Sequence, residues 1–360
     1  MICPICAAVG EFRRVDAREM MFGWREVFSY AECPHCGSLH LLTVPADLGR
    51  FYPRQYYSLA APARPKRKGT GVRGQFARWL LASRSGIAER ASRLLVRKYP
   101  FLRWLRLCSA STKAAVLDVG CGSGGLLYRM RRWGFSNLRG VDPFTGNTVR
   151  EPGLVVERAE LAQVEATFDV IMFNHVLEHV ADPLATLTLA RAKLRPGGAI
   201  LVRIPVAGSH LAQRFGANWF NLDAPRHLAI PSRRGMTILA ERAGLDLVHA
   251  EYDGDEKSII MSERYARDVP MIAPEMDLDR QGRRAKVRLA RQLNRTGDGD
   301  LGVFVLRRPS AAPAPDGETC ARNGTLLSRE QTPPSGPAGE SLLGRSQVEA
   351  EAAQSPRTPR

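Results

Sequence analysis

The sequence predicts an α/β fold: a seven-stranded, mostly parallel sheet, preceded by a small cysteine-containing module and followed by a disordered C-terminal tail. Three observations support this prediction. Residues 109–308 alternate short apolar runs with helical patterns, which is typical of a parallel sheet with crossover helices. Two Cys-x-x-Cys pairs lie near the N-terminus. Residues 309–360 contain eight prolines and few large apolar side chains, so this tail buries too little surface to fold.

The expected strands are short apolar runs bounded by turn residues. There are seven, at residues 114–119, 138–141, 154–156, 168–173, 199–204, 245–250 and 301–306. Helical patterns cover residues 76–95, 126–130, 182–194 and 232–243. Pro196-Gly197-Gly198 is a stop signal for the helix at 182–194, and Pro100 should end or kink the helical segment before it.

Composition places the chain among globular proteins. Of its 360 residues, 44% are apolar and 24% are charged. No run of 18 apolar residues predicts a transmembrane helix, and the first residues lack the basic and apolar regions of a secretory signal. The two Cys-x-x-Cys pairs favour metal binding over disulfides in a reducing compartment. We therefore expect a cytoplasmic protein and exclude the integral-membrane, collagen-like and disulfide-scaffold classes.

The net charge of +16 is concentrated in two segments. Residues 61–107 carry 13 Lys and Arg against one acid, and residues 280–295 carry seven Lys and Arg and no acid. These segments sum to +19, so the rest of the chain sums to −3. Nucleic acid, a phosphate-bearing substrate or an anionic membrane surface could use such segments, and solvated helix faces explain them equally well.

The sharpest motif is the run Val116–Gly125, in which an apolar strand enters a glycine-rich turn before a helix. Gly120, Gly122 and Gly125 fit a dinucleotide loop, whereas Gly120, Gly122 and Gly124 fit an S-adenosylmethionine (SAM) loop; in both, Asp142 would bind the ribose. Asp118 favours SAM, because the methionine α-amino group would compensate a buried carboxylate that a pyrophosphate would destabilise further.

Residues 109–308 resemble the class I SAM-dependent methyltransferase family, whose domain is a Rossmann-like seven-stranded sheet. Val116–Gly124, Gly140–Phe144 and Leu194–Gly198 match the motifs of this family in order and spacing. The resemblance implies SAM as the cofactor. It also implies contacts to the cofactor from the residues Asp118, Gly120, Gly122, Gly124, Asp142, Ala159, Glu160, Asn174 and His175, with Ala159 and Glu160 near the adenine.

Three histidines are candidates for the acceptor side of the site: His175, His179 and His227. The stretch from Trp219 to Leu228 resembles the Trp…Asp-x-Pro-Arg-His-Leu segment of methyltransferases from polysaccharide and secondary-metabolite pathways. We therefore predict His179 and His227 as the catalytic residues, with packing at a helix start as the alternative for each. The expected reaction is methyl transfer to a small-molecule acceptor, a sugar or glycan intermediate or a secondary metabolite.

Two other functions stay open. An RNA methyltransferase, such as one acting on ribosomal RNA, would use the N-terminal module and the basic segments to bind RNA. The chain lacks the Asp/Asn-Pro-Pro-Tyr/Phe motif of many nucleobase amino-methyltransferases, which makes nucleic acid the less favoured partner. Alternatively, residues 72–107, with Trp79 and Trp104, could contact an anionic membrane peripherally, or form a lid helix over the cofactor domain.

The four N-terminal cysteines Cys3, Cys6, Cys33 and Cys36 suit a closed tetrahedral zinc site, with a redox dithiol as the alternative. His35 and His40 are potential substitute ligands, and we expect the cysteines Cys108, Cys121 and Cys320 to be free. The module resembles the zinc-ribbon front end of the same methyltransferases, where it would support a lid or contact the acceptor, with a small hairpin through residues 20–30. The predicted regions are therefore a zinc-ribbon-like module at 1–58, a basic helical linker or lid at 59–108, the methyltransferase domain at 109–308 and the tail at 309–360.

Overall fold

The computed structural model describes residues 1–53, 71–83, 100–146, 148–274 and 279–309. The predicted helical residues 84–95 and nearly all of the predicted tail lie outside these ranges, as does Cys320. Residues Met1–Ala311 pack as one compact unit. In the described ranges no helix is both long enough and apolar enough to cross a membrane.

A mixed sheet of eight strands forms the centre of the described chain, in the order β11-β12-β9-β8-β4-β5-β7-β6. The strands are β4 (Val116–Val119), β5 (Leu138–Val141), β6 (Val149–Glu151), β7 (Leu154–Glu157), β8 (Phe168–Asn174), β9 (Leu194–Pro205), β11 (Asp246–Tyr252) and β12 (Leu301–Arg307). Strands β9, β8, β4, β5 and β7 run parallel, whereas β12 is antiparallel to both β9 and β11. The α/β, mostly parallel architecture is therefore confirmed.

The structure differs from the sequence prediction in two strands. An eighth strand, β6, pairs antiparallel with β7 at the edge of the sheet. Strand β9 begins at Leu194, five residues before the predicted start, and helix α5 ends at Ala192 rather than at 194. The Pro196-Gly197-Gly198 run therefore lies within the long strand and does not end a helix, because the chain leaves α5 at Lys193 and immediately pairs with β8.

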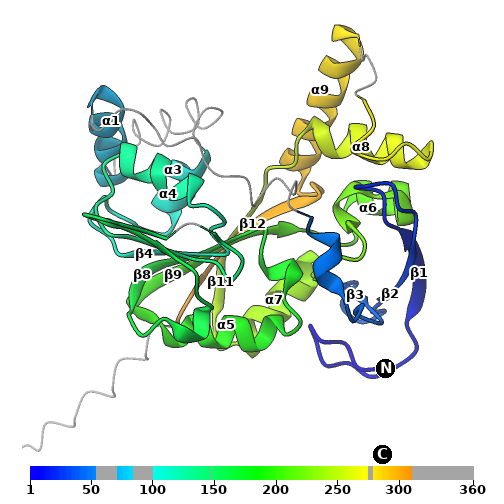
Figure 1. The fold of residues 1–360 in the computed structure, drawn as a ribbon, viewed down its shortest axis with the longest axis horizontal. Helices are drawn as coiled ribbons and strands as arrows, with labels where there is room; N and C mark the ends of the chain where they lie inside the picture. Colours follow the sequence, from blue (N-terminus) through cyan, green and yellow to red (C-terminus); the bar gives the residue numbers. More distant parts are fainter. Residues whose placement is uncertain (54–70, 84–99, 147, 275–278, 310–360) are drawn as a thin grey trace, which may run out of the picture. The chain divides into compact units, whose positions relative to one another are not determined.

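Helices cover both faces of the sheet (Figure 1). Helices α1 (Gly71–Ala82), α3 (Pro100–Leu107) and α4 (Gly125–Arg132) cover one face, and α5 (Pro183–Ala192) and α7 (Arg233–Arg242) cover the other. The described chain also contains α6 (His210–Phe215), α8 (Glu256–Ala266) and α9 (Arg280–Thr296). The core under α1, α3 and α4 is separate from the core under α5 and α7. Pro100 is the first residue of α3, where its missing N–H costs nothing. The residues before it, where the helix that it should end or kink was predicted, lie outside the described ranges.

A second sheet of four strands contains the N-terminal residues. Strands β1 (Arg13–Arg18), β2 (Val27–Glu32) and β3 (Leu39–Leu41) follow one another, and β10 (Ala229–Ile230) completes the sheet beside β3. The predicted hairpin is present, with its strands flanking residues 19–26 and Arg13 opposite Glu32. Because β10 comes from the segment directly after His227, the front module shares a sheet with the chain next to the predicted acceptor site.

The insertion between β11 and β12 forms α8 and α9, which pack on each other and extend away from the central sheet (Figure 1). Helix α9 carries the second basic segment. In the first basic segment, Trp79 is exposed, but Trp104 is only 1% exposed and its Nε1 donates to Glu251 at 2.7 Å. Trp104 is therefore core and does not form part of a membrane-facing surface.

Candidate active site

The glycine turn lies at the carboxyl end of β4. Gly120, Gly122 and Gly124 all have left-handed φ angles, of +65°, +54° and +84°, which favour glycine. A Cβ on Gly120 would lie 2.4 Å from Cγ2 of Val176, and one on Gly124 would lie 2.8 Å from Cγ2 of Val156. Gly124 precedes the first residue of α4, so the first turn of this helix, whose N–H groups have no intrahelical acceptors, begins at this edge of the sheet.

Two acids flank the turn. The Asp142 carboxylate, at the end of β5, accepts hydrogen bonds from the backbone N–H of Gly122 at 2.9 Å and of Phe144 at 2.8 Å. Asp118 is 3% exposed, and its burial, followed by the charge of Asp142, raises its pKa to about 7. A cation next to Asp118 would restore its ionised form, which is what the sequence analysis expects of the SAM α-amino group.

Ala159 and Glu160 follow β7, which is the parallel neighbour of β5, so they lie at the same edge as Asp142. The backbone N–H of Asp142 donates to the carbonyl of Glu157, which joins the two strand ends. Glu160 is exposed and forms a reciprocal capping box with Gln163, whose Oε1 accepts the backbone N–H of Glu160 at 2.7 Å.

Asn174 is the last residue of β8, the parallel neighbour of β4 on its other side, and His175 follows it. His175 has a φ of +56°, and both of its ring nitrogens are engaged. Its Nε2 accepts from Arg203 Nη1 at 2.6 Å, so Nδ1 carries the proton and donates to Glu178 Oε1 at 3.3 Å. Arg203 in turn donates from its Nε to Asp253 Oδ2 at 2.9 Å. His175 is thereby fixed as a donor that orients Glu178.

Glu178, His179 and His227 form a compact group, in which one ligand-type atom from each lies within 4.8 Å of the others. The His179 and His227 rings meet edge to face at 4.7 Å. His227 Nδ1 donates to the Asn221 carbonyl at 2.8 Å, and His179 Nδ1 donates to the Arg226 carbonyl at 2.9 Å. A carbonyl only accepts, so each ring carries a hydrogen on Nδ1, and in the neutral form of the ring the lone pair is on Nε2.

The charges in this group are set by burial and neighbours. Burial, followed by the proximity of His179, lowers the pKa of His227 to about 4, so this ring is neutral at pH 7. Burial opposes ionisation of Glu178, but the hydrogen bond from His175 and the nearby histidines lower its pKa to about 2. The group therefore combines one buried carboxylate with two imidazole lone pairs.

The front module contributes residues to the same region. The Tyr52 hydroxyl lies 3.1 Å from His179 Nδ1, and the Tyr30 hydroxyl donates to the His227 carbonyl at 2.9 Å. Arg226, which is fully buried, donates to Glu19 at 2.9 Å and to Asp223 at 2.6 Å. Five of these side chains were not predicted as site residues from the sequence: Glu19, Tyr30, Tyr52, Asp223 and Arg226. Asp223 and Arg226 lie in the Asp-x-Pro-Arg-His segment, which was the available signal for two of them.

The four cysteines of the front module converge. The Sγ atoms of Cys3 and Cys36 are 3.7 Å apart, as are those of Cys6 and Cys33. A tetrahedral zinc site with bonds of about 2.3 Å has edges of about 3.8 Å, which these two distances match, and all four Sγ atoms lie within 4.8 Å of one another. The residues that follow the two pairs, Ala7 and Gly37, have matching φ angles of +61° and +71°. His35 and His40 are outside this group of ligands, while Cys108 and Cys121 are free.

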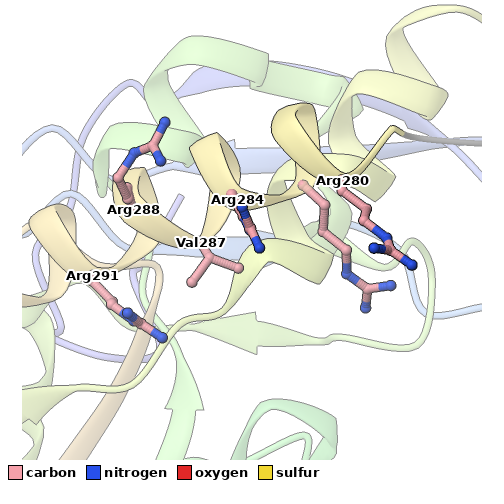
Figure 2. Close-up of a pocket in the computed structure, with 6 residues that line it drawn as sticks. Arg280, Arg284, Val287, Arg288 and Arg291 are labelled. Atoms are coloured by element: carbon pink, nitrogen blue, oxygen red, sulfur yellow. The ribbon is translucent and has the colours of Figure 1, made fainter.

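The second basic segment forms a separate feature on α9. Figure 2 shows a hollow lined by Val287 and a row of arginine side chains, namely Arg280, Arg283, Arg284, Arg288 and Arg291. Arg283 contacts Glu256 at 3.4 Å. Among the described residues, the other four arginines have no acidic partner, and each is exposed. These arginines form a positively charged stripe on α9, outside the glycine-turn edge.

The parallel strands, the glycine turn and the acids at one sheet edge have the Rossmann-like arrangement that the sequence predicts for a SAM-dependent methyltransferase domain. Residues 88–250 match the family model described as a methyltransferase domain. The chain is 37% identical over 97 residues to a ubiquinone biosynthesis O-methyltransferase from Cereibacter sphaeroides, covering 24% of this chain and 39% of that protein.

Two further comparisons found similar proteins. A ubiquinone biosynthesis O-methyltransferase from Parvibaculum lavamentivorans is 32% identical over 171 residues, which are 44% of this chain and 61% of that protein. The chain thus spans less than two thirds of the length of these curated relatives. A solved SAM-dependent methyltransferase from Mesorhizobium loti aligns with a TM-score of 0.39 and 17% identity, covering 59% of this chain and 100% of that one.

Proposed function

We propose that this chain transfers the methyl group of SAM to a hydroxyl group of a small-molecule acceptor. The observation that carries the proposal is the position of the two imidazole Nε2 lone pairs. Val176 lies against Gly120, and Glu178 and His179 lie in the short helix that follows Val176. In this proposal the two lone pairs lie beside the cofactor turn, where an acceptor hydroxyl has to meet the methyl group.

In this proposal the cofactor lies along the carboxyl edge of the sheet. Gly120, Gly122 and Gly124 admit it against the backbone, and Asp142 accepts hydrogen bonds from its ribose. Ala159 and Glu160 border the adenine, and Asp118 and Asn174 face the methionine end, with His175 beside them. Alignment of the acceptor oxygen with the methyl carbon would supply most of the rate enhancement, because the sulfonium is already an activated electrophile.

Three features support a small hydroxylated acceptor. The stretch from Trp219 to Leu228 resembles methyltransferases of sugar and secondary-metabolite pathways, and the relatives above are O-methyltransferases by name. His179 and His227 offer lone pairs that accept a hydrogen bond from a hydroxyl group. The proposed acceptor is therefore a sugar or glycan intermediate or a phenolic or other hydroxylated metabolite.

We also propose structural zinc at Cys3, Cys6, Cys33 and Cys36. Four thiolates would close its coordination shell, so the ion would hold the front module together and take no part in methyl transfer. Its contribution to the site is indirect: the module carries Tyr30 and Tyr52, which contact the His227 carbonyl and the His179 ring.

The test is calorimetric titration of the purified chain with SAM and with its demethylated product, together with metal analysis. Micromolar binding of both, with one zinc per chain, would support the proposal; a folded chain that binds neither would refute it. Product formation would then be followed by mass spectrometry with hydroxylated sugars and phenols as acceptors.

RNA is a second candidate acceptor, and the stripe on α9 is the observation that favours it. Arg284→Ala with Arg288→Ala would weaken binding of a structured RNA and reduce the slope of log K against log salt by about two. The matched control is Arg131→Ala with Arg150→Ala, which removes two arginines that have acidic partners. Equal RNA binding by all three proteins would discard this alternative.

A further inference from the structure

We propose that Glu178, His179 and His227 bind a divalent metal ion, at a site separate from the four cysteines. This inference rests on the proposed function and deepens it, because the ion would hold the acceptor hydroxyl. Two imidazoles and one carboxylate are a recurrent ligand set for Zn²⁺ and other first-row divalent ions.

The geometry of the three side chains is close to that of a metal site. His227 Nε2 lies 4.0 Å from Glu178 Oε1, and all three ligand atoms lie within 4.8 Å of one another. A tetrahedral ion with bonds of about 2.1 Å needs edges of about 3.4 Å. The three side chains would therefore close on an ion by moving about an ångström, without a change in the backbone.

The other ring nitrogens are held as metal ligands require. His179 and His227 donate their Nδ1 hydrogens to the backbone carbonyls of Arg226 and Asn221. Such a bond fixes the tautomer, so that Nε2 is free to coordinate, and it fixes the plane of the ring.

A second and independent observation points to a cation. Glu178 is fully buried, and its Oε2 has no hydrogen-bond partner in the described chain. His175 satisfies only Oε1, and no arginine or lysine is paired with this carboxylate among the described residues. A buried carboxylate oxygen without a partner is costly, and a divalent ion between Glu178 and the two imidazoles would compensate it.

Three protein ligands leave coordination positions open for an acceptor. An acceptor hydroxyl bound to the ion would have a lowered pKa and would release its proton to solvent. The oxygen would then form a bond to the methyl carbon while the carbon–sulfur bond breaks. SAM, which carries a sulfonium, would leave as the neutral thioether, so that one methyl ether, one thioether and one proton are formed.

The experiment uses the full chain with its cysteine site loaded with zinc and other ions removed. Co²⁺ is then titrated in, and visible d–d absorption is recorded alongside metal content by mass spectrometry. We expect one Co²⁺ per chain in addition to zinc, without a thiolate-to-metal charge-transfer band. His227→Gln and His179→Gln should each weaken Co²⁺ binding 10–100-fold. His249→Gln, which alters a histidine paired with Glu251, is the matched control and should bind Co²⁺ as the parent does.

The outcomes separate this inference from the proposed function. No Co²⁺ uptake beyond the cysteine site, or equal uptake by the His227 and His179 variants, would overturn the metal site. SAM titration of the same samples is independent of the ion. If SAM binds but Co²⁺ does not, the metal site fails and the methyltransferase proposal stands. If Co²⁺ binds but SAM does not, the methyltransferase proposal fails. Because Glu178 is buried, its substitution could unfold the chain. Co²⁺ binding by Glu178→Gln is therefore measured only if a thermal melt shows that this variant is folded.

Discussion

Arg226 is the side chain whose loss should destabilise the protein most clearly. It is fully buried and pairs with Glu19, which is also fully buried, and with Asp223. Burial opposes the ionisation of Asp223, but the charge of Arg226 and its hydrogen bonds lower the pKa of this carboxyl group. Arg226→Met would keep most of the side-chain volume and remove the charge, leaving two carboxylates in the interior.

The expected size follows from the environment of each acid. Removing one partner of a buried ion pair costs about 3–5 kcal/mol, because the remaining charge stays uncompensated. Glu19 keeps backbone N–H donors from Met21, Phe22 and Trp24, so most of the cost falls on Asp223. We therefore expect the free energy of unfolding to fall by about 3 kcal/mol or more, and Tm to fall by at least about 6 °C.

Urea unfolding followed by tryptophan fluorescence measures this change. Arg13→Met is the matched control, because Arg13 pairs with Glu32 on the surface with 72% of its side chain exposed. That substitution should cost no more than about 1 kcal/mol. If Arg226→Met costs as little as Arg13→Met, then the buried pair does not hold the front module to the acceptor loop, and the reasoning is refuted.

Three further predictions concern the cofactor turn and the metal site. Because the pKa of Asp118 is raised to about 7, SAM affinity should increase by up to about tenfold for each unit by which the pH is raised towards 7, and it should be constant above pH 7. Asp118→Asn should bind SAM weakly, with an affinity that calorimetry shows to be independent of pH. If this variant keeps the pH dependence, the assignment is contradicted. Gly120→Ala places a Cβ 2.4 Å from Val176 at a φ of +65° and should abolish measurable SAM binding, whereas unchanged affinity would show that the turn relaxes. Cys33→Ser should reduce zinc to well below one per chain and lower Tm, and full zinc retention would rule out the four-cysteine site.

The sequence predicts the central strands well, because each is an apolar run bounded by turn residues. Strands β6 and β10 were missed for a physical reason: they have only three and two residues, too few to show a period of two. The start of β9 was misplaced because Pro-Gly-Gly is typical of a helix end, yet here pairing with β8 carries the strand through it.

Some residues of the candidate site could be predicted from the sequence and others could not. Glycines and acids next to a strand end form a local pattern, so residues such as Gly120 and Asp142 could be selected from the sequence. The pairing of Glu19 with Arg226 and the contact of Tyr52 with His179 join residues more than a hundred positions apart. Such contacts depend on how the two sheets meet, and no local pattern encodes them.

The two-residue strand β10 has a consequence for how this chain can change. It pairs with β3 of the front module, and Ser38 of that module accepts the backbone N–H of Ser232 at 3.1 Å, just beyond β10. The module is therefore attached by backbone hydrogen bonds to the segment that follows His227. Replacing the module by an unrelated domain would require sequence changes in two separate segments, the N-terminal residues and the segment around β10 that follows β9. The module and the acceptor loop should therefore be inherited together.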